Sequence, residues 1–499
     1  MKFANMVQKK IEFFYRWFIL KYNRRSFVHK SVAVVIGVVI LFSILGCARY
    51  HPRPITKDVV HNRLQPSDMA QVQALALEIK HPILHPVQLQ ADKGLSPDGA
   101  AVLAVLLNPS LRAVRNQREL SDAQIFEAGL LPNPQLHYSL DKPTGGDTAG
   151  KVNAFGLELD WNVASLIARA SKVREAKARG EAVDLDIAWR EWQVAQGTKA
   201  AVYKLSSLLN QIALIDQVRK QVAKNLVYVR KAVSDGYMSA SDINSVRVAS
   251  SLVNERLLLF KKQADQQRLK LLRLMGVPAN SKVHLSKNLS LPSKIILPKK
   301  SLVEGLEQRR LDLLALRSGY DSQDAAVRVA VLEQFPRITI GPTINRDTDN
   351  LRTTGFSLNI ELPLFNRGRG GIVAKRATRK KLYDEYIARV FGTRSDIEQL
   401  KSGIRFLNEQ IVAAQATEAN FRELVKNYRK ALTDGRVNAL VYYRIWSDLI
   451  DAQIKVVDLK GQLAQAMVAL ELATGFFEIP GVKQSFDTVS TKSNVEERQ

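Results

Sequence analysis

The sequence Arg230-Lys-Ala-Val-Ser-Asp-Gly236 returns almost unchanged as Arg429-Lys-Ala-Leu-Thr-Asp-Gly435, 199 residues further along the chain. The next recognisable helix end, Met275-Gly276, has its counterpart in Thr474-Gly475 at the same offset. Equal offsets at both points predict two helices of equal length, each following a tight turn. Because an internal duplication decides the fold before any local feature does, we interpret the chain as one unit written twice.

Two pairs of alternating segments precede these turns. Residues 136–140 and 154–161 alternate apolar with small or polar side chains, and residues 338–344 and 355–364 do the same in the second half. Such alternation is typical of half-buried strands, and in a membrane it gives one lipid-facing side and one wet side. Each half is therefore predicted to run helix, strand, strand, long helix, long helix. The fold class is mainly α with a small β part.

The predicted helices are long because no proline interrupts them. Prolines are absent from residues 144–277 and from residues 364–479, and a proline inside a helix costs roughly 3 kcal/mol. A helix from about residue 171 to residue 234 would extend on the order of 95 Å. Apolar residues after the turn at Asp434 recur with a 3.5-residue period, which predicts a left-handed coiled coil. An antiparallel coiled coil without a channel fits this periodicity equally well.

The number of strands predicts association. Four strands cannot close a barrel, since about eight are needed and open sheet edges are not tolerated in lipid. Three copies would supply twelve strands around one pore. This reasoning predicts a β-barrel that is shared between copies of the chain.

The single cysteine follows a short apolar run. Basic residues up to Lys30 precede the apolar residues 32–45, which end in Gly46-Cys47. The run is too short to span a bilayer comfortably and matches the apolar part of a signal peptide. The pattern resembles a bacterial lipoprotein signal, which implies that residues 1–46 are removed and that Cys47 is the site of lipid attachment. Ala48 favours the outer membrane, and an uncleaved anchor is the alternative.

The net charge is +25, of which residues 1–46 supply +7 and the remaining +18 has no assigned role. No nucleic-acid-binding pattern accompanies it, so we expect no nucleic acid partner. No catalytic elbow, phosphate loop or paired carboxylates occur, so an enzyme is not expected and no cofactor is predicted. His81 and His85 have a helical metal-ligand spacing, but Pro82 and Pro86 argue against a helix there, so no metal site is predicted.

Two junction motifs complete the pattern. Leu130-Leu-Pro-Asn-Pro-Gln-Leu136 enters the first strand, and Leu362-Pro-Leu-Phe-Asn-Arg-Gly-Arg369 leaves the last. Together with the duplicated turns, they make residues 97–476 similar to the TolC-like outer-membrane factors, closest to the branch that serves resistance-nodulation-division efflux pumps. We divide the chain into a signal peptide, an N-terminal lipid-anchored segment, a first repeat, a linker, a second repeat and a disordered tail; these are residues 1–46, 47–96, 97–277, 278–299, 300–476 and 477–499.

The resemblance implies a homotrimer in outer-membrane lipid that forms a trimeric 12-stranded outer-membrane β-barrel. This barrel continues as an α-helical coiled-coil barrel that extends into the periplasm. It also implies docking onto a periplasmic adaptor (membrane fusion) protein and an inner-membrane transporter, with passive conduction of drugs or metal ions to the exterior. Two alternatives remain: the outer-membrane exit of a protein-secretion system, which would share this fold, and a periplasmic coiled-coil lipoprotein without a pore.

The resemblance also places candidate site residues at the turns. Gly236 and Gly435 are the expected hairpin tips, where the adaptor docks. Asp242 resembles an acid that braces neighbouring hairpins, with Arg436 as its partner. The family commonly places acids after the second turn as a gate. This chain departs from that pattern, since Arg444 occupies one such position and Asp448 lies further on, so an acidic constriction is in doubt.

Overall fold

The computed structural model describes residues 50–65, 69–89, 94–286, 289–298, 301–434, 436–437 and 439–486. The chain divides into two compact units, Met1–Gln65 and Pro66–Gln499. In the first unit the described residues form helix α3 (Lys57–Leu64), whose N-terminus is capped by the hydroxyl of Thr56. The predicted signal peptide, Cys47 and Gly435 lie outside the described residues.

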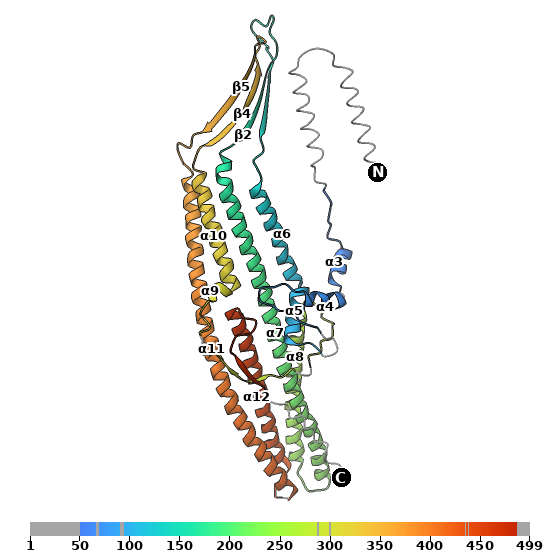
Figure 1. Ribbon diagram of the computed structural model, residues 1–499. Coiled ribbons are helices and arrows are strands. Elements are labelled where there is room, and N and C mark those ends of the chain that lie inside the picture. The colour runs from blue at the N-terminus through green and yellow to red at the C-terminus, as the bar shows by residue number, and fades with distance from the viewer. Residues whose placement is uncertain are drawn as a thin grey trace. The chain divides into compact units, whose positions relative to one another are not determined.

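The second unit contains two successive sets of elements (Figure 1). The first set is α4 (Met69–Leu77), α5 (Pro97–Leu107), α6 (Pro109–Gly129), β1 (Gln135–Asp141), β2 (Ala154–Asn162), α7 (Ser165–Ser234) and α8 (Ala240–Met275). The second set is β3 (Pro292–Ile296), α9 (Leu306–Arg309), α10 (Leu311–Leu332), β4 (Arg337–Arg346), β5 (Arg352–Glu361), α11 (Arg369–Thr433), α12 (Ala439–Thr474) and β6 (Lys483–Phe486). The order helix, strand, strand, long helix, helix therefore occurs twice.

The long helices agree closely with the sequence pattern. Helices α7 and α11 contain 70 and 65 residues. Helices α8 and α12 contain 36 residues each, the equal lengths that the equal offsets predict. None of the helices in the described part of the chain is long and apolar enough to cross a membrane.

The core lies along the seams between these helices. Ile397, Ile404 and Ile411 of α11 recur at heptad spacing and are at most 1% exposed. They pack with Leu459 and Leu463 of α12, which belong to the same predicted 3.5-residue series. Burying each such side chain contributes roughly 1.5–3 kcal/mol. The helices therefore pair along the predicted stripe, because that stripe is where their apolar surface is concentrated.

The four predicted strands form one antiparallel sheet at the end of the helices where α7 and α11 begin, in the order β1-β2-β4-β5 (Figure 1). The central pair β2–β4 joins the two halves of the chain, so neither half has a sheet of its own. Among the described residues, the outer strands β1 and β5 each pair on one side only.

Two short strands lie in the segments predicted to be a linker and a disordered tail. Strand β3 lies inside residues 278–299 and pairs antiparallel with β6, which lies inside residues 477–499. The tail is therefore not disordered at Lys483–Phe486. Asn408 of α11 fixes β3, because its amide both accepts from the Ile295 amide and donates to the Ile295 carbonyl, at 3.0 and 2.7 Å. A four-residue strand gives too short an alternation to be recognised in the sequence.

Candidate functional site: the sheet, the hairpin tips and the helix junctions

One face of the sheet is apolar across all four strands. Leu136, Tyr138 and Leu140 of β1 stand opposite Leu159, Leu157 and Phe155 of β2. Ile338 and Ile340 of β4 continue the face to Ile360 and Leu358 of β5. Direct cross-strand partners share a face, so the register aligns these side chains. Leu136, Tyr138 and Leu140 are 58–64% exposed, which leaves a continuous apolar surface uncovered in the single chain.

The opposite face is polar and hollowed. Side chains from all four strands line a depression of about 350 Å³ at the helix-proximal end of the sheet; they include Gln135, Asp160, Asn162, Arg337, Thr339, Asn359 and Glu361. Arg337 and Glu361 lie 3.8 Å apart, and His137 lies 3.6 Å from Asp160. The two faces therefore differ as a lipid-facing and a water-facing side should.

Glycine is required at one position of the sheet. A Cβ built on Gly341 would lie 1.4 Å from the carbonyl oxygen of Leu159 on the neighbouring strand. The next residue, Pro342, has no amide hydrogen to donate to the ladder. Strands β2 and β4 therefore need a residue without a side chain at this point of their pairing.

The two hairpin turns have the same hydrogen bonds. At the α7–α8 turn, Asp235 N donates to Lys231 O at 2.9 Å and Tyr237 N donates to Ala232 O at 2.8 Å. At the α11–α12 turn the corresponding bonds, Asp434 N to Lys430 O and Arg436 N to Ala431 O, are 2.9 and 2.8 Å. Gly236 has a φ of +80°, a left-handed conformation that ends the helix as predicted.

Within one chain, the predicted bracing pair has other partners. The Asp242 carboxylate accepts from the amide and the hydroxyl of Ser239, at 2.9 and 2.8 Å. This capping box starts α8, and its hydrogen bonds to Ser239 lower the pKa of Asp242. Arg436 instead donates to Asp434 at 2.5 Å. A contact between Asp242 and Arg436 of neighbouring copies stays a prediction.

The two gate candidates lie on the first turns of α12. Arg444 is exposed and Asp448 is half-buried. Neither belongs to an ion pair with another residue that the structure describes. Their role as a gate stays a prediction, because it depends on how the tips of several copies meet.

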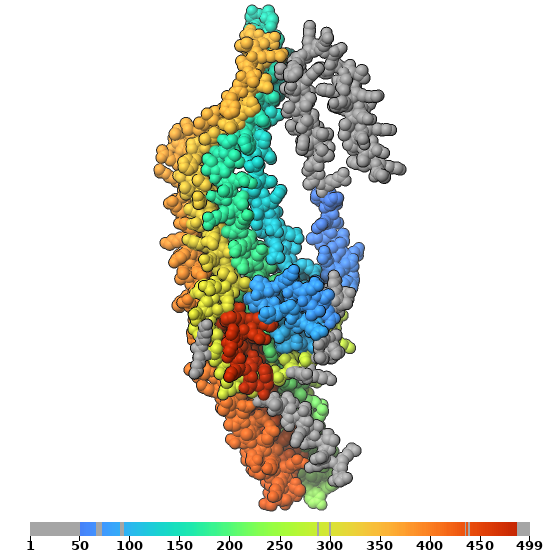
Figure 2. Space-filling view, viewed as in Figure 1, coloured from blue at the N-terminus to red at the C-terminus, as the bar shows by residue number. Residues whose placement is uncertain are grey.

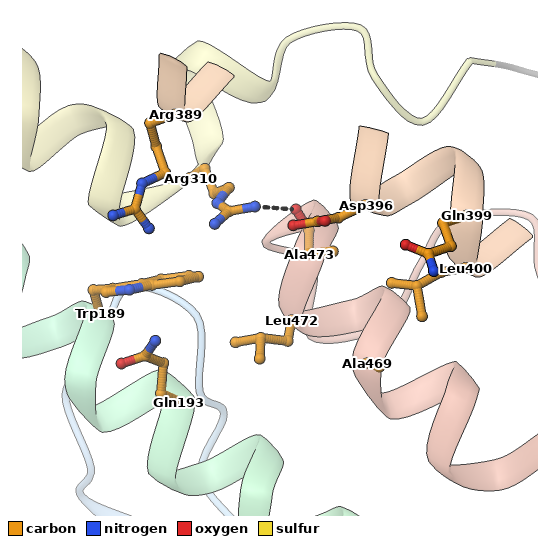
Figure 3. A pocket seen from close by; sticks show the side chains of 10 residues that line it. All are labelled: Trp189, Gln193, Arg310, Arg389, Asp396, Gln399, Leu400, Ala469, Leu472 and Ala473. Atoms are coloured by element: carbon orange, nitrogen blue, oxygen red, sulfur yellow. Dashed lines mark hydrogen bonds between the residues drawn. The ribbon is translucent and has the colours of Figure 1, made fainter. Parts of the chain in front are cut away.

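Two end-to-end helix junctions support the body beneath the sheet. In the first, Asn108 ends α5 and begins α6; its side-chain amide donates to Leu274 O of α8 at 2.8 Å. In the second, Arg310 ends α9 and begins α10, and it donates to Ala473 O of α12 at 3.0 Å (Figure 3). Helices α6 and α10 therefore begin where α8 and α12, the last helices of their own repeats, end.

The second junction is charged. Asp312 holds the Arg310 guanidinium through two hydrogen bonds of 2.7 and 2.9 Å, and both side chains are at most 8% exposed. The guanidinium also lies 4.8 Å from the Trp189 ring. Arg389 and Asp396 line a hollow of about 460 Å³ at this junction (Figure 3). An arginine that is bound through two hydrogen bonds and stacked on a ring is held rigidly. Arg310, Asp312 and Trp189 therefore stabilise the packing of the helices around this junction.

A second ion cluster, buried at Lys199 and Glu471, lies near the end of α12. Lys199 Nζ of α7 is 3.0 Å from Glu471 Oε2 and 3.1 Å from Asp98 Oδ1. Burial raises the pKa of Glu471 to about 7. Burial also lowers the pKa of Lys199, but the two carboxylates outweigh it and raise that pKa above its ordinary value. The cluster therefore holds one ammonium against two carboxylates, and sequence reasoning missed it.

The imidazole of His81 is hydrogen-bonded to the backbone. Its Nε2 lies 3.1 Å from Ala188 O, and its Nδ1 accepts from the amides of Ile83 and Leu84 at 3.1 and 3.0 Å. Burial lowers the pKa of the imidazole. In the described part of the chain, no group of three or more His, Cys, Asp or Glu side chains is arranged to hold a metal ion.

The duplicated order, the amphipathic four-stranded sheet and the long paired helices are the features that the resemblance to outer-membrane channel subunits implies. Residues 302–476 match the model of the family described as outer membrane efflux protein. This match covers the second repeat of the chain and agrees with the resemblance to the TolC-like outer-membrane efflux proteins.

Particular relatives agree with this assignment. The chain is 22% identical over 394 residues to the cobalt-zinc-cadmium resistance protein CzcC of Cupriavidus metallidurans, which covers 76% of this chain and 90% of the relative. Its fold matches CusC, whose crystal structures concern transmembrane channel formation, with a TM-score of 0.65, at 15% identity over 80% of this chain and 98% of CusC. It matches VceC of Vibrio cholerae with a TM-score of 0.64, at 16% identity over 77% and 97% of the two chains.

Proposed function

We propose that this protein is the outer-membrane channel of a tripartite efflux pump. The observation that carries the proposal is the four-stranded sheet, which has one exposed apolar face, one polar face and two edges that are unpaired within the chain. In lipid, unpaired backbone groups cost several kcal/mol each, so such edges require partners. A homotrimer satisfies them if β1 of one copy pairs with β5 of the next.

In the proposed trimer the polar face of each sheet lines the pore and the apolar face contacts outer-membrane lipid. The paired helices continue the pore through the periplasm to the two hairpin tips. The tips, at Gly236 and Gly435, dock onto a periplasmic adaptor, and an inner-membrane transporter drives the cargo. The channel itself is a passive conduit, and Cys47 is the proposed site of a lipid anchor.

The cargo class we favour is divalent metal ions. The support is the sequence similarity to CzcC, which is named as a cobalt-zinc-cadmium resistance protein. Drugs are the other class of cargo that a channel of this family implies. A conduit does not have to bind what it passes, so the cargo is decided by the pump rather than by a site in this chain.

Planar-bilayer conductance tests the proposal. The purified full chain should form discrete channels and migrate as a heat-resistant trimer. Gly341→Val should abolish both, because its side chain overlaps the neighbouring strand, whereas Gly370→Val, at a position with no neighbouring atom within 4 Å of a built Cβ, should retain both. A monomer without conductance would exclude the channel and favour the poreless coiled-coil alternative.

Metal export tests the cargo separately. Deleting the gene should raise intracellular zinc or cobalt after metal challenge, and the intact gene should restore export only together with its pump. Unchanged metal accumulation combined with normal bilayer conductance would exclude metal cargo and leave the channel assignment intact.

A further inference from the structure

The surplus positive charge of the chain is concentrated in two short segments. Residues 367–381 contain seven Lys or Arg and no acid, and residues 169–179 contain five with one acid. Together they supply +11 of the +18 that lies outside residues 1–46. If the charge were spread evenly along the chain, these 26 residues would carry only a small part of it. The concentration therefore suggests that the two segments bind an anionic partner.

Both segments lie at the same end of the sheet. Strand β2 leads into α7 and strand β5 leads into α11. Since β2 and β5 are both antiparallel to β4, they run in the same direction and end at the same edge. The basic residues therefore form a collar where the sheet meets the helices. Figure 2 shows the start of α11, in orange, on an open surface next to the strands.

Most of the collar has no counter-charge among the residues that the structure describes. Lys172, Arg379 and Lys381 pair with Glu333, Asp324 and Glu385. Eight others are exposed and lack an ion pair with any residue that the structure describes: Arg174, Lys177, Arg179, Arg367, Arg369, Lys375, Arg376 and Lys380.

An exposed apolar belt lies directly beside the collar. Phe365 is 100% exposed, Leu364 is 66% exposed and Leu362 is 64% exposed, on the loop that joins β5 to α11. Phe335, on the loop before β4, is 58% exposed. The belt continues the apolar face of the sheet, and its last residue is followed within four positions by Arg367 and Arg369. Apolar side chains followed by cations are the order found at a membrane surface.

We propose that the collar binds the anionic headgroups of phospholipids in the leaflet next to the helices, and so fixes the depth of the channel in the membrane. This inference rests on the proposed function, because the apolar face must lie in lipid. Each cation near an anionic surface strengthens attraction about fivefold, and the effect decays within about 8 Å at physiological salt. Arg367 and Arg369 lie at the boundary and act most strongly.

The helix geometry gives the proposal a depth gradient. Arg376 and Lys380 follow Arg369 by 7 and 11 residues of α11, which places them about 10 and 16 Å further along the helix. Headgroup binding should therefore weaken in the order Arg369, Arg376, Lys380.

Lipid retention in nanodiscs tests the inference. The full chain is reconstituted in phosphatidylethanolamine containing phosphatidylglycerol, and the retained lipids are counted by native mass spectrometry. The native protein should be enriched in phosphatidylglycerol over the bulk ratio. Arg367→Gln/Arg369→Gln should reduce the enrichment at least fivefold, and 1 M salt should do the same. Arg230→Gln/Arg247→Gln is the matched control, since both arginines are exposed near the opposite end of the helices, and it should change nothing.

Each contrary result has a distinct meaning. Bulk lipid ratios around the native protein, equal losses in the control, or a Lys380→Gln effect as large as that of Arg369→Gln would each refute headgroup binding. So would loss of the trimer with lipid ratios unchanged, which would assign the collar to a contact between copies, or a shifted reversal potential alone, which would place it in the pore. Conductance of the native protein in zwitterionic bilayers tests the proposed function independently.

Discussion

The two helix junctions have the same backbone arrangement, but different kinds of side chain form their hydrogen bonds. At the first, the neutral side chain of Asn108 accepts from Ser110 N at 2.8 Å and donates to Leu274 O. At the second, Arg310 occupies the corresponding position, and no side chain caps the helix there. A cation suits the C-terminus of α12 but not the N-terminus of α10. Asp312, in the first turn of α10, offsets that conflict.

The comparison shows what duplication preserves. The backbone arrangement is kept, because the end of one helix must meet the start of another in both repeats. The side chains diverged, and the second junction gained a buried ion pair that needs both partners. The first junction should therefore tolerate loss of its polar side chain better than the second.

The largest expected effect is at Arg310. Arg310→Met removes the bidentate partner of the buried Asp312 and leaves only Arg389, 3.5 Å away, so the free energy of unfolding should fall by about 4 kcal/mol. The double variant Arg310→Met/Asp312→Leu removes both charges and should recover most of that loss. Denaturant unfolding of the detergent-solubilised protein measures both. Equal losses in the single and double variants would show that packing, not the unpaired charge, is responsible.

The next largest effect on stability is expected at the glycines that follow α8 and α12. Both have a positive φ, +67° for Gly276 and +72° for Gly475. A Cβ on Gly276 would lie 2.6 Å from Leu107 O, whereas a Cβ on Gly475 would have 3.5 Å to its nearest atom. Gly276→Ala should cost about 3 kcal/mol and Gly475→Ala about 1 kcal/mol. Thermal unfolding of the two variants side by side decides this, and a reversed order would contradict the tighter packing of the first junction.

The ion cluster near the second junction should make stability depend on pH. Because burial raises the pKa of Glu471 to about 7, the folded chain binds a proton that the unfolded chain has already released. Stability should therefore decrease as pH rises from about 5 to 7, by about 2 kcal/mol, and then level off. Glu471→Gln should remove this decrease. A similar slope in the variant would assign the titration to another group.

Several elements could be predicted from the sequence because their signals are local. The proline-free stretches, the 3.5-residue period and the strand alternation each lie within one segment, and they located α7, α8, α11, α12 and the four-stranded sheet. The capping box of Ser239 and Asp242 was also visible as a local pattern. We assigned Asp242 to a contact between hairpins, while within the chain it caps α8.

The buried ion pairs could not be predicted in this way. Lys199 and Glu471 are 272 positions apart, and their contact depends on which helices lie side by side. Arg310 and Asp312 are near neighbours, yet their burial follows from the arrival of α12. Charged residues on a helix are usually solvated, so the sequence alone favours an exposed face for all four.

Of the two polar side chains at the helix junctions, Asn108 has the smaller expected effect. Asn108→Ala removes the cap of α6 and the bond to Leu274 O, and Asn108→Asp keeps the cap acceptor while removing the donor to that carbonyl. Losing a cap costs about 1 kcal/mol, and losing a single hydrogen bond costs a similar amount. Asn108→Ala should therefore destabilise by about 2 kcal/mol, half the loss at Arg310, because no buried charge is left behind. Hydrogen exchange at the amides of Ser110 and Leu111 separates the two contributions. Both amides should exchange faster in Asn108→Ala and stay protected in Asn108→Asp, and equal protection in both variants would mean that Pro109 and the surrounding packing, rather than the side chain, fix the start of α6.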